Sequence, residues 1–218
     1  MNEINRFSVN FYADNLIQPC IEAAAEVNVG LTLNFINKGR DPEFVMQTTI
    51  AKEYINNANV PIEMCAYVGN YKEAILATTT PCNEVSVKNG ELNEEEIKDV
   101  IKIYHAINRK VQVECDDVAS AAKYTELGAD KIEVPCDLVE EVSKINKTVT
   151  SLNDETVDEA KKMFAKNVST ILLDKSLNVE ATKTMRTQKE VNPYSIKVIE
   201  EYFRGYKEQI KTFLKEAK

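Results

Sequence analysis

The sequence predicts a single (β/α)8 TIM barrel over residues 1–218, ending in a long C-terminal helix. Short apolar or alternating runs recur at intervals of roughly 20 residues, and amphipathic helical patterns separate them. Strict alternation of strands and helices is typical of a parallel sheet, and eight such units favour a closed barrel. No linker or change in composition divides the 218 residues. We therefore expect one domain.

Eight runs are the expected strands: residues 7–13, 29–33, 61–67, 84–88, 110–115, 130–135, 148–151 and 170–173. In a barrel, alternate strand residues face the lumen and the others face the surrounding helices. On the third to sixth strands the expected helix side is apolar, with Ile62, Met64, Val85, Val87, Val111, Val113, Ile132 and Val134. This side should pack under the helices.

Three expected helices carry distinct signals. One should start at Asp41, where Asp, Pro and Glu in succession suit a cap and a first turn. The next should follow Asn93 and Glu96, a plausible capping pair. Its apolar stripe has three- and four-residue spacing and consists of Ile97, Val100, Ile101, Tyr104 and Ile107. The last should cover residues 194–217 as a long amphipathic helix.

The lumen side of the middle strands is unusually polar. The residues expected there are Glu63, Cys65, Tyr67, Ser86, Lys88, Gln112, Glu114, Lys131 and Glu133. Charges in a lumen cost several kcal/mol each unless they are paired. The pattern therefore indicates an internal network of ion pairs, a working site, or both. In such a network we expect Lys131 to pair with Glu114 or Glu133.

Composition excludes several classes of protein. A net charge of −8, with 27 basic residues spread along the chain, offers no basic stripe for nucleic acid. No apolar run approaches ~20 residues and the N-terminus does not resemble a secretory signal, so we expect a cytoplasmic protein without membrane contact. The five cysteines form no CxxC pair and suggest buried, reduced thiols. We expect no metal and no cofactor.

Three segments resemble motifs of the transaldolase and fructose-6-phosphate aldolase family. Residues 30–34 (GLTLN) are similar to the second-strand GVTTN motif, and residues 11–14 (FYAD) to the first-strand FxxD. Residues 83–88 (NEVSVK) are similar to the NIVVK strand that ends in the imine-forming lysine. The order of the motifs is kept over nearly the whole chain. The resemblance implies a class I, Schiff-base enzyme of carbohydrate metabolism, as in the pentose phosphate reactions.

The resemblance assigns roles to four residues. Lys88 would be the nucleophile that attacks a ketose carbonyl, and Asp14 the acid/base. Thr32 and Asn34 would bind the substrate. All but Thr32 should lie at strand ends on the side of the barrel where active sites occur. In an arbitrary barrel, however, Lys88 would be a solvated strand-end lysine and Asp14 a helix cap.

This chain departs from the family at several positions. The family's strand-five threonine is replaced by Gln112, and no arginine follows the sixth strand, where the family binds phosphate. Ser151, Lys175 and Arg186 are the remaining candidates for an anionic group of the substrate. Imine chemistry is therefore better supported than recognition of a sugar phosphate.

Two carboxylates share the expected lumen with the lysine. Glu63 and Glu114, together with Gln112, could position a water molecule. A nearby anion would also raise the pKa of a lysine and oppose a neutral amine. We expect structural ion pairs for both carboxylates slightly more than a role in catalysis.

The sequence thus predicts a transaldolase or aldolase, a transferase or lyase, that acts on ketose and aldehyde substrates. The alternative is a non-catalytic or repurposed barrel that binds a metabolite or a protein partner, since the arginine and other family positions are changed. A homo-oligomer through the C-terminal helix is expected, because its apolar residues exceed one narrow face. They are Tyr202, Phe203, Tyr206, Ile210, Phe213 and Leu214.

Overall fold

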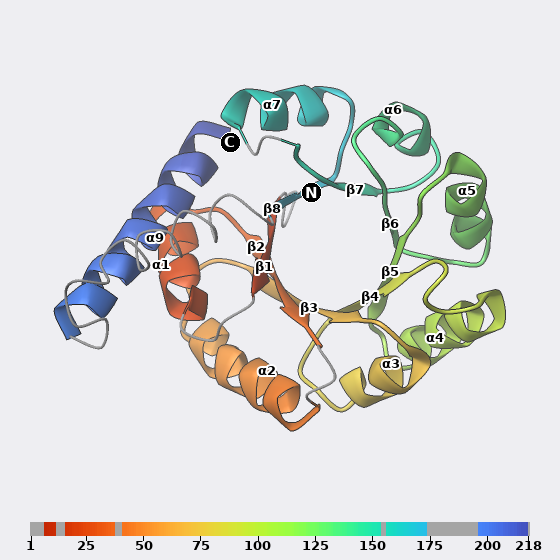
Figure 1. The fold of residues 1–218 in the computed structure, drawn as a ribbon, viewed down its shortest axis with the longest axis horizontal. Coiled ribbons are helices and arrows are strands. Elements are labelled where there is room, and N and C mark those ends of the chain that lie inside the picture. Colours follow the sequence, from red (N-terminus) through yellow and green to blue (C-terminus); the bar gives the residue numbers. More distant parts are fainter. Residues whose placement is uncertain (1–6, 12–15, 38–40, 154–155, 174–195, 218) are drawn as a thin grey trace.

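The computed structural model describes residues 7–11, 16–37, 41–153, 156–173 and 196–217. Parallel strands close into a barrel in which each strand pairs with its neighbours in sequence and β1 pairs with β8 (Figure 1). The strands are β1 (Phe7–Phe11), β2 (Leu31–Ile36), β3 (Ile62–Val68), β4 (Glu84–Lys88), β5 (Lys110–Glu114), β6 (Lys131–Glu133), β7 (Thr148–Ser151) and β8 (Thr170–Leu173). The predicted (β/α)8 fold is confirmed.

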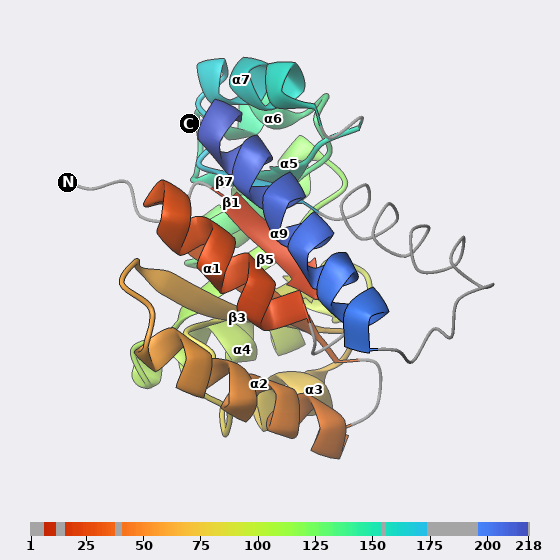
Figure 2. The ribbon, with the colours of Figure 1, turned by 90° about the vertical axis from the view of Figure 1, so that its left-hand side faces the viewer.

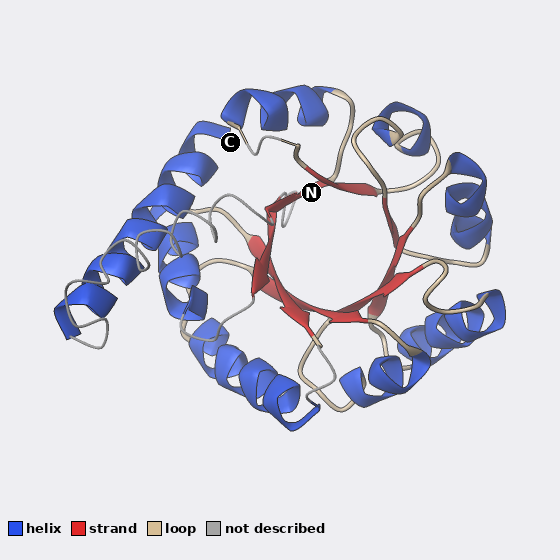
Figure 3. Ribbon diagram, viewed as in Figure 1, coloured by secondary structure: helices blue, strands red, loops and turns tan. Residues whose placement is uncertain are grey.

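Helices surround the strands as an outer ring (Figure 3). They are α1 (Ile17–Val27), α2 (Asp41–Asn56), α3 (Tyr71–Ala77), α4 (Glu94–Ala106), α5 (Val118–Glu126), α6 (Val139–Val142), α7 (Val157–Ala165) and α9 (Ile196–Ala217). Each strand of the described chain is thereby covered on its outer face, while its inner face points into the lumen.

The second strand is longer than its sequence pattern predicts. The expected end was residue 33, but β2 continues to Ile36. Asn34, which looked like the polar end of the run, is 1% exposed and donates a hydrogen bond to Asn10 Oδ1 at 2.8 Å. A buried amide with partners inside the barrel lets the strand continue through a polar residue.

Helix starts follow the capping signals. Asn93 and Glu96 form the predicted capping box, in which each side chain accepts the other's backbone N–H, and α4 begins directly after Asn93. Helix α2 begins at Asp41, with Asp41 and Glu43 in its first turn, where acidic side chains favour the helix dipole. The capping box therefore fixes the start of α4, and the acidic first turn favours the start of α2.

The apolar core lies between the strands and the helices. The residues predicted for the helix side are buried there, apart from the partly buried Ile62: Met64, Val85, Val87, Val111, Val113, Ile132 and Val134. The alternation of strand residues thus assigns these side chains to the correct face, and the lumen takes the polar set.

Helix α9 lies beside α1 and runs across the outer face of the barrel (Figure 2). Its Tyr206, Ile210, Phe213 and Leu214 are buried within the chain itself. Lys207 forms ion pairs with α1 carboxylates, one of them to Glu22 at 2.8 Å. The described part of α9 therefore packs against its own barrel.

Among the described helices, none is long and apolar enough to span a membrane.

Candidate functional site

The lumen holds three levels of polar side chains, and the lowest is an ionic one. Lys131 Nζ lies 2.6 Å from Glu84 Oε2, and the two side chains are 11% and 1% exposed. Lys110 pairs with Glu63 at 2.9 Å. Glu84, Lys131 and Lys110 are the first residues of β4, β6 and β5, so these pairs lie at the N-terminal end of the barrel, opposite the expected active-site end.

The partner expected for Lys131 was wrong. We predicted Glu114 or Glu133, but the ammonium contacts Glu84, two strands away. Strands in a barrel are tilted and staggered, so residues on adjacent strands with the same inward direction reach different heights. Burial opposes the charged form of Lys131, yet the attraction of Glu84 outweighs it and raises the lysine pKa. Lys131 is thus a paired, buried cation rather than a free amine.

The middle level is a hydrogen-bonded network from four consecutive strands. The Gln112 amide lies 2.8 Å from the hydroxyl of Tyr67, 3.2 Å from Ser86 Oγ and 2.6 Å from Glu133 Oε2. The Tyr67 hydroxyl also donates to Glu133 Oε2 at 2.8 Å. Burial, followed by the Glu133 charge, raises the pKa of Tyr67 well above its usual value, so the phenol stays protonated. Gln112 therefore belongs to this network, and the water-positioning role predicted for it stays a prediction.

The upper level contains the predicted nucleophile. Lys88 and Glu114 are the last residues of β4 and β5, and Lys88 Nζ lies 2.6 Å from Glu114 Oε1. The side chains are 39% and 30% exposed. The hydrogen bond and the charge of Glu114 raise the pKa of Lys88. The lysine is therefore an ammonium ion at neutral pH, and the carboxylate that holds it can also accept its proton.

Two cavities open at this end of the barrel. The first, of about 360 Å³, is called the Lys88 cavity and is lined by Ile36, Asn37, Tyr67, Val68, Gly69, Ser86, Val87, Lys88, Glu91 and Glu114. It brings the lysine, a carboxylate, a phenol and a hydroxyl to one small space. A ketone of a few carbons has room to reach the amine there.

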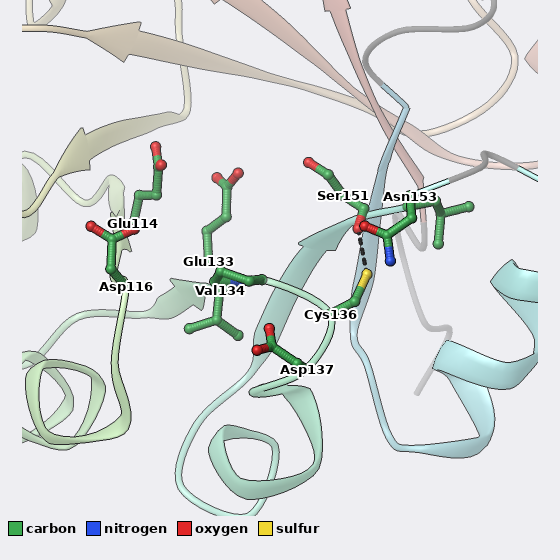
Figure 4. Close-up of a pocket in the computed structure, with 10 residues that line it drawn as sticks. Glu114, Asp116, Glu133, Val134, Cys136, Asp137, Ser151 and Asn153 are labelled. Atoms are coloured by element: carbon green, nitrogen blue, oxygen red, sulfur yellow. Dashed lines mark hydrogen bonds between the residues drawn. The ribbon is translucent and has the colours of Figure 1, made fainter.

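The second cavity, of about 480 Å³, is called the acidic cavity (Figure 4). Its lining consists of Glu114, Asp116, Glu133, Val134, Pro135, Cys136, Asp137, Ser151, Leu152 and Asn153. Glu114 belongs to both cavities, so the two are neighbours. Within the described residues, no group of three His, Cys, Asp or Glu side chains is arranged to hold a metal ion.

Of the predicted substrate-binding residues, three lie in the described part of the structure, and they occupy two different places. Ser151 lines the acidic cavity, and its carbonyl accepts the Cys136 thiol at 2.7 Å (Figure 4). Thr32 is buried with its hydroxyl unpartnered, and Asn34 donates to Ser8 and Asn10. From β2 and the residue after it, Ile36 and Asn37 reach the Lys88 cavity, while Asn34 does not.

Three further predicted residues, Asp14, Lys175 and Arg186, lie outside the described residues. Glu63 is paired with Lys110 at the opposite end of the barrel. The ion pair expected for Glu63 is therefore present, while its role in positioning water stays a prediction.

The sequence placed Tyr67 and Glu133 in the lumen but gave Tyr67 no role, and it gave Glu133 only that of a possible partner for Lys131. The signal that could have singled them out is the alternation of the strands, which puts both on the inner face near the C-terminal ends of β3 and β6. Their mutual contact, three strands apart, depends on the curvature of the closed barrel.

No protein-family model matches the chain, and no curated protein sequence matches it. Solved structures do. The chain is similar to the YdjI aldolase of Escherichia coli K12, at 16% identity and a TM-score of 0.85, over 98% of this chain and 91% of the other. It is also similar to the fructose-bisphosphate aldolase of Campylobacter jejuni, at 14% identity and a TM-score of 0.69, over 98% and 88%.

The N-acetylmannosamine-6-phosphate 2-epimerase of Clostridium perfringens matches as well, with 14% identity, a TM-score of 0.64, and coverage of 85% of this chain and 93% of the other. Identities this low show a shared fold, and a fold of this kind supports many reactions. The chain therefore has the (β/α)8 barrel architecture found in solved aldolases and in this epimerase.

Proposed function

We propose that the chain is an aldolase-type enzyme that forms an imine between Lys88 and a ketone or ketose donor. The observation that carries the proposal is the Lys88–Glu114 pair at the C-terminal end of the barrel, on the wall of a cavity that a small donor can enter. The resemblance of residues 83–88 to the family strand ending in a Schiff-base lysine agrees with it. Aldolase and transaldolase outcomes share this imine, and the proposal includes both.

The pair supplies the proton transfers that imine formation requires. Lys88 gives one ammonium proton to Glu114, and the neutral amine attacks the donor carbonyl. A second nitrogen proton moves to the former carbonyl oxygen, giving a neutral carbinolamine. Glu114 then returns its proton to the carbinolamine hydroxyl, which leaves as water while the nitrogen lone pair forms the C=N bond. The products are an iminium ion and the original carboxylate, so charge and atoms balance.

We propose that the preferred donor is small, hydroxyl-rich and unphosphorylated. The described linings of the two cavities contain several carboxylates, and Lys88 is the basic side chain they contain. A phosphate dianion beside carboxylates is repelled, whereas hydroxyl groups can donate hydrogen bonds to them. Dihydroxyacetone-type donors fit this description.

A barrel that binds a metabolite without chemistry is the second candidate. The observation in its favour is the raised pKa of Lys88, because an ammonium held by a carboxylate is also a good binder of carbonyl and hydroxyl oxygens. In that case the Lys88–Glu114 pair would recognise a ligand and never become covalent.

Borohydride trapping distinguishes the two candidates. The protein is treated with sodium borohydride in the presence of dihydroxyacetone or fructose 6-phosphate, and its intact mass and its peptides are measured. An imine former gains the mass of the reduced donor at Lys88, while Lys88→Met, which keeps volume and an apolar stem, gains none there. Modification of Lys131 or of scattered lysines in place of Lys88 rejects Lys88 as the imine-forming residue. No modification up to alkaline pH rejects the imine and leaves the binding role.

A further inference from the structure

Tyr67 connects the two cavities, because it lines one of them and its hydroxyl donates a hydrogen bond to a residue that lines the other. Tyr67 lines the Lys88 cavity, and its hydrogen-bond acceptor Glu133 lines the acidic cavity. Glu133 is 8% exposed, so the carboxylate is almost enclosed although it borders the second cavity. The hydroxyl and the carboxylate thus form a short path for a proton, from the space beside the lysine to the space beyond it.

The network orients this path. Glu133 Oε2 accepts hydrogen bonds from both Tyr67 and Gln112, and donors of this kind stabilise the ionised carboxylate. Gln112 also contacts the Tyr67 oxygen at 2.8 Å, so the phenol proton is directed at Glu133. The Tyr67 hydroxyl already donates its proton to Glu133 in a hydrogen bond. When a second proton reaches the phenol oxygen, the first can therefore move to the carboxylate.

We propose that Tyr67, together with Glu133, transfers the proton to and from the carbon next to the Lys88 imine. The inference rests on the proposed function, since it requires the imine. It assigns Tyr67 and Glu133 to the protonation of the enamine carbon, the step that precedes release of the product. An enzyme that protonates its own enamine completes an aldolase reaction, rather than waiting for an acceptor aldehyde.

The step balances as follows in the direction of enamine formation. The C–H bond beside the iminium carbon breaks, and its electron pair forms the C=C bond while the C=N pair returns to the Lys88 nitrogen. The released proton goes to the Tyr67 oxygen, and the phenol proton moves to Glu133 Oε2. The iminium charge and the carboxylate charge disappear together, which leaves a neutral enamine and a neutral carboxylic acid.

The charge state of Tyr67 agrees with a relay rather than with a phenolate base. Because burial and the Glu133 charge raise its pKa, Tyr67 does not lose its proton alone near neutral pH. A proton can be accepted only when another leaves toward Glu133. Both residues are therefore required, and each can be tested without removing Lys88.

Deuterium exchange into dihydroxyacetone tests the step without an acceptor aldehyde. The protein is incubated with the donor in D₂O, and loss of the CH₂ signal is followed by NMR, with borohydride trapping and thermal unfolding measured on the same samples. For Tyr67→Phe we expect exchange to fall by about 10²–10⁴ while trapping at Lys88 persists. Glu133→Gln should show the same pattern, because it keeps the shape and removes the proton acceptor.

Tyr104→Phe is the matched control. The Tyr104 hydroxyl is buried and donates to the Ala74 carbonyl at 2.8 Å, on the helix side of the barrel. Removing this hydroxyl leaves the Ala74 carbonyl without a buried donor, so thermal stability should fall. The rate of deuterium exchange into the donor should stay unchanged. If Tyr67→Phe unfolds, Glu133→Gln and its exchange rate decide the question.

The outcomes separate this inference from the proposed function. Absence of trapping in the unmodified protein rejects the imine itself. Trapping with exchange unchanged in Tyr67→Phe or in Glu133→Gln rejects the relay and keeps the imine. Loss of trapping in a folded Tyr67→Phe protein also rejects the assignment, because the residue would then act in imine formation.

Discussion

Lys88 is the residue whose environment decides whether this barrel can carry out covalent chemistry. Its side chain is 39% exposed, and the carboxylate of Glu114, 2.6 Å from the ammonium, contributes most to its raised pKa. A raised pKa reduces the neutral amine at pH 7, so the fraction able to attack a carbonyl grows as pH rises. The same carboxylate can accept the proton, and a pH profile can therefore distinguish its two effects.

Replacing Glu114 with Gln should move the pH profile of trapping to lower pH. The largest causes of the raised Lys88 pKa are the hydrogen bond and the charge of Glu114, so their removal lowers that pKa and frees amine at a lower pH. The measurement is the rate of borohydride-trapped adduct between pH 6 and 10. Glu91→Gln, a weaker contributor to the same pKa, is the control and should move the profile less. An unchanged profile for Glu114→Gln would show that the pair does not govern the amine.

Asp14→Asn tests the acid/base role that the resemblance implies. The change keeps the shape and one acceptor but removes the base, and should lower turnover by on the order of 10²–10⁴. Trapping at Lys88 should continue, because the imine forms before the carbon–carbon bond is cleaved. Turnover equal to that of the unmodified protein would exclude Asp14 from proton transfer.

At the level of strands, the sequence predicts well which side chains point into the lumen, but it predicts their hydrogen-bond and ion-pair partners poorly. Alternation put Lys131 inside the lumen correctly, since the residue period of a strand is two. Its pairing with Glu84 depends on the stagger between β4 and β6. This stagger cannot be read from the sequence of either strand alone. The end of β2 was missed because Asn34 is polar and buried, a combination decided only by its partners on β1.

The Lys131–Glu84 pair should be structural. Removing either partner leaves a buried charge alone, which costs about 3–5 kcal/mol of folding free energy. We expect Lys131→Met and Glu84→Gln each to lower urea stability strongly, and the double variant to lose less than the sum of the two. Wherever the single variant remains folded, trapping at Lys88 should be unaffected. If the double variant lost as much unfolding free energy as the two single variants together, the two residues would not interact directly.

At the scale of the whole molecule, most of the apolar side chains expected to form an oligomer interface are buried within the chain itself. Four of the apolar residues in α9 that suggested an interface are buried against the chain's own barrel: Tyr206, Ile210, Phe213 and Leu214. The prediction of an oligomer through the C-terminal helix now depends on Tyr202 and Phe203, whose side chains lie outside the described part of the structure. Assembly through this helix therefore stays a prediction.

Sedimentation velocity at micromolar concentration tests it directly. We expect a species larger than the monomer, and a monomer when Tyr202 and Phe203 are both replaced with Ser, since an interface built on two aromatic side chains would lose its apolar area. Met46→Ser on α2, which removes an apolar side chain that is 51% exposed, is a control on another surface. A monomer in the unmodified protein would contradict the prediction.

The charge of the molecule argues against phosphorylated substrates. The net charge is −8, and carboxylates line both cavities at the C-terminal end of the barrel. We expect kcat/KM for dihydroxyacetone to equal or exceed that for dihydroxyacetone phosphate. The gap should narrow at 200 mM salt compared with 10 mM, because salt screens the repulsion between exposed charges.

Two residues could reverse this preference. Lys175 and Arg186 are the remaining candidates for an anion-binding role after β8, and a bidentate guanidinium recognises phosphate well. If they act in that way, the phosphorylated donor should become poorer still when both are replaced with Ala, while the unphosphorylated donor is unaffected. A strong preference for the phosphorylated donor that survives the double replacement would mean that carboxylate repulsion does not control selection, and the proposed donor class would be wrong.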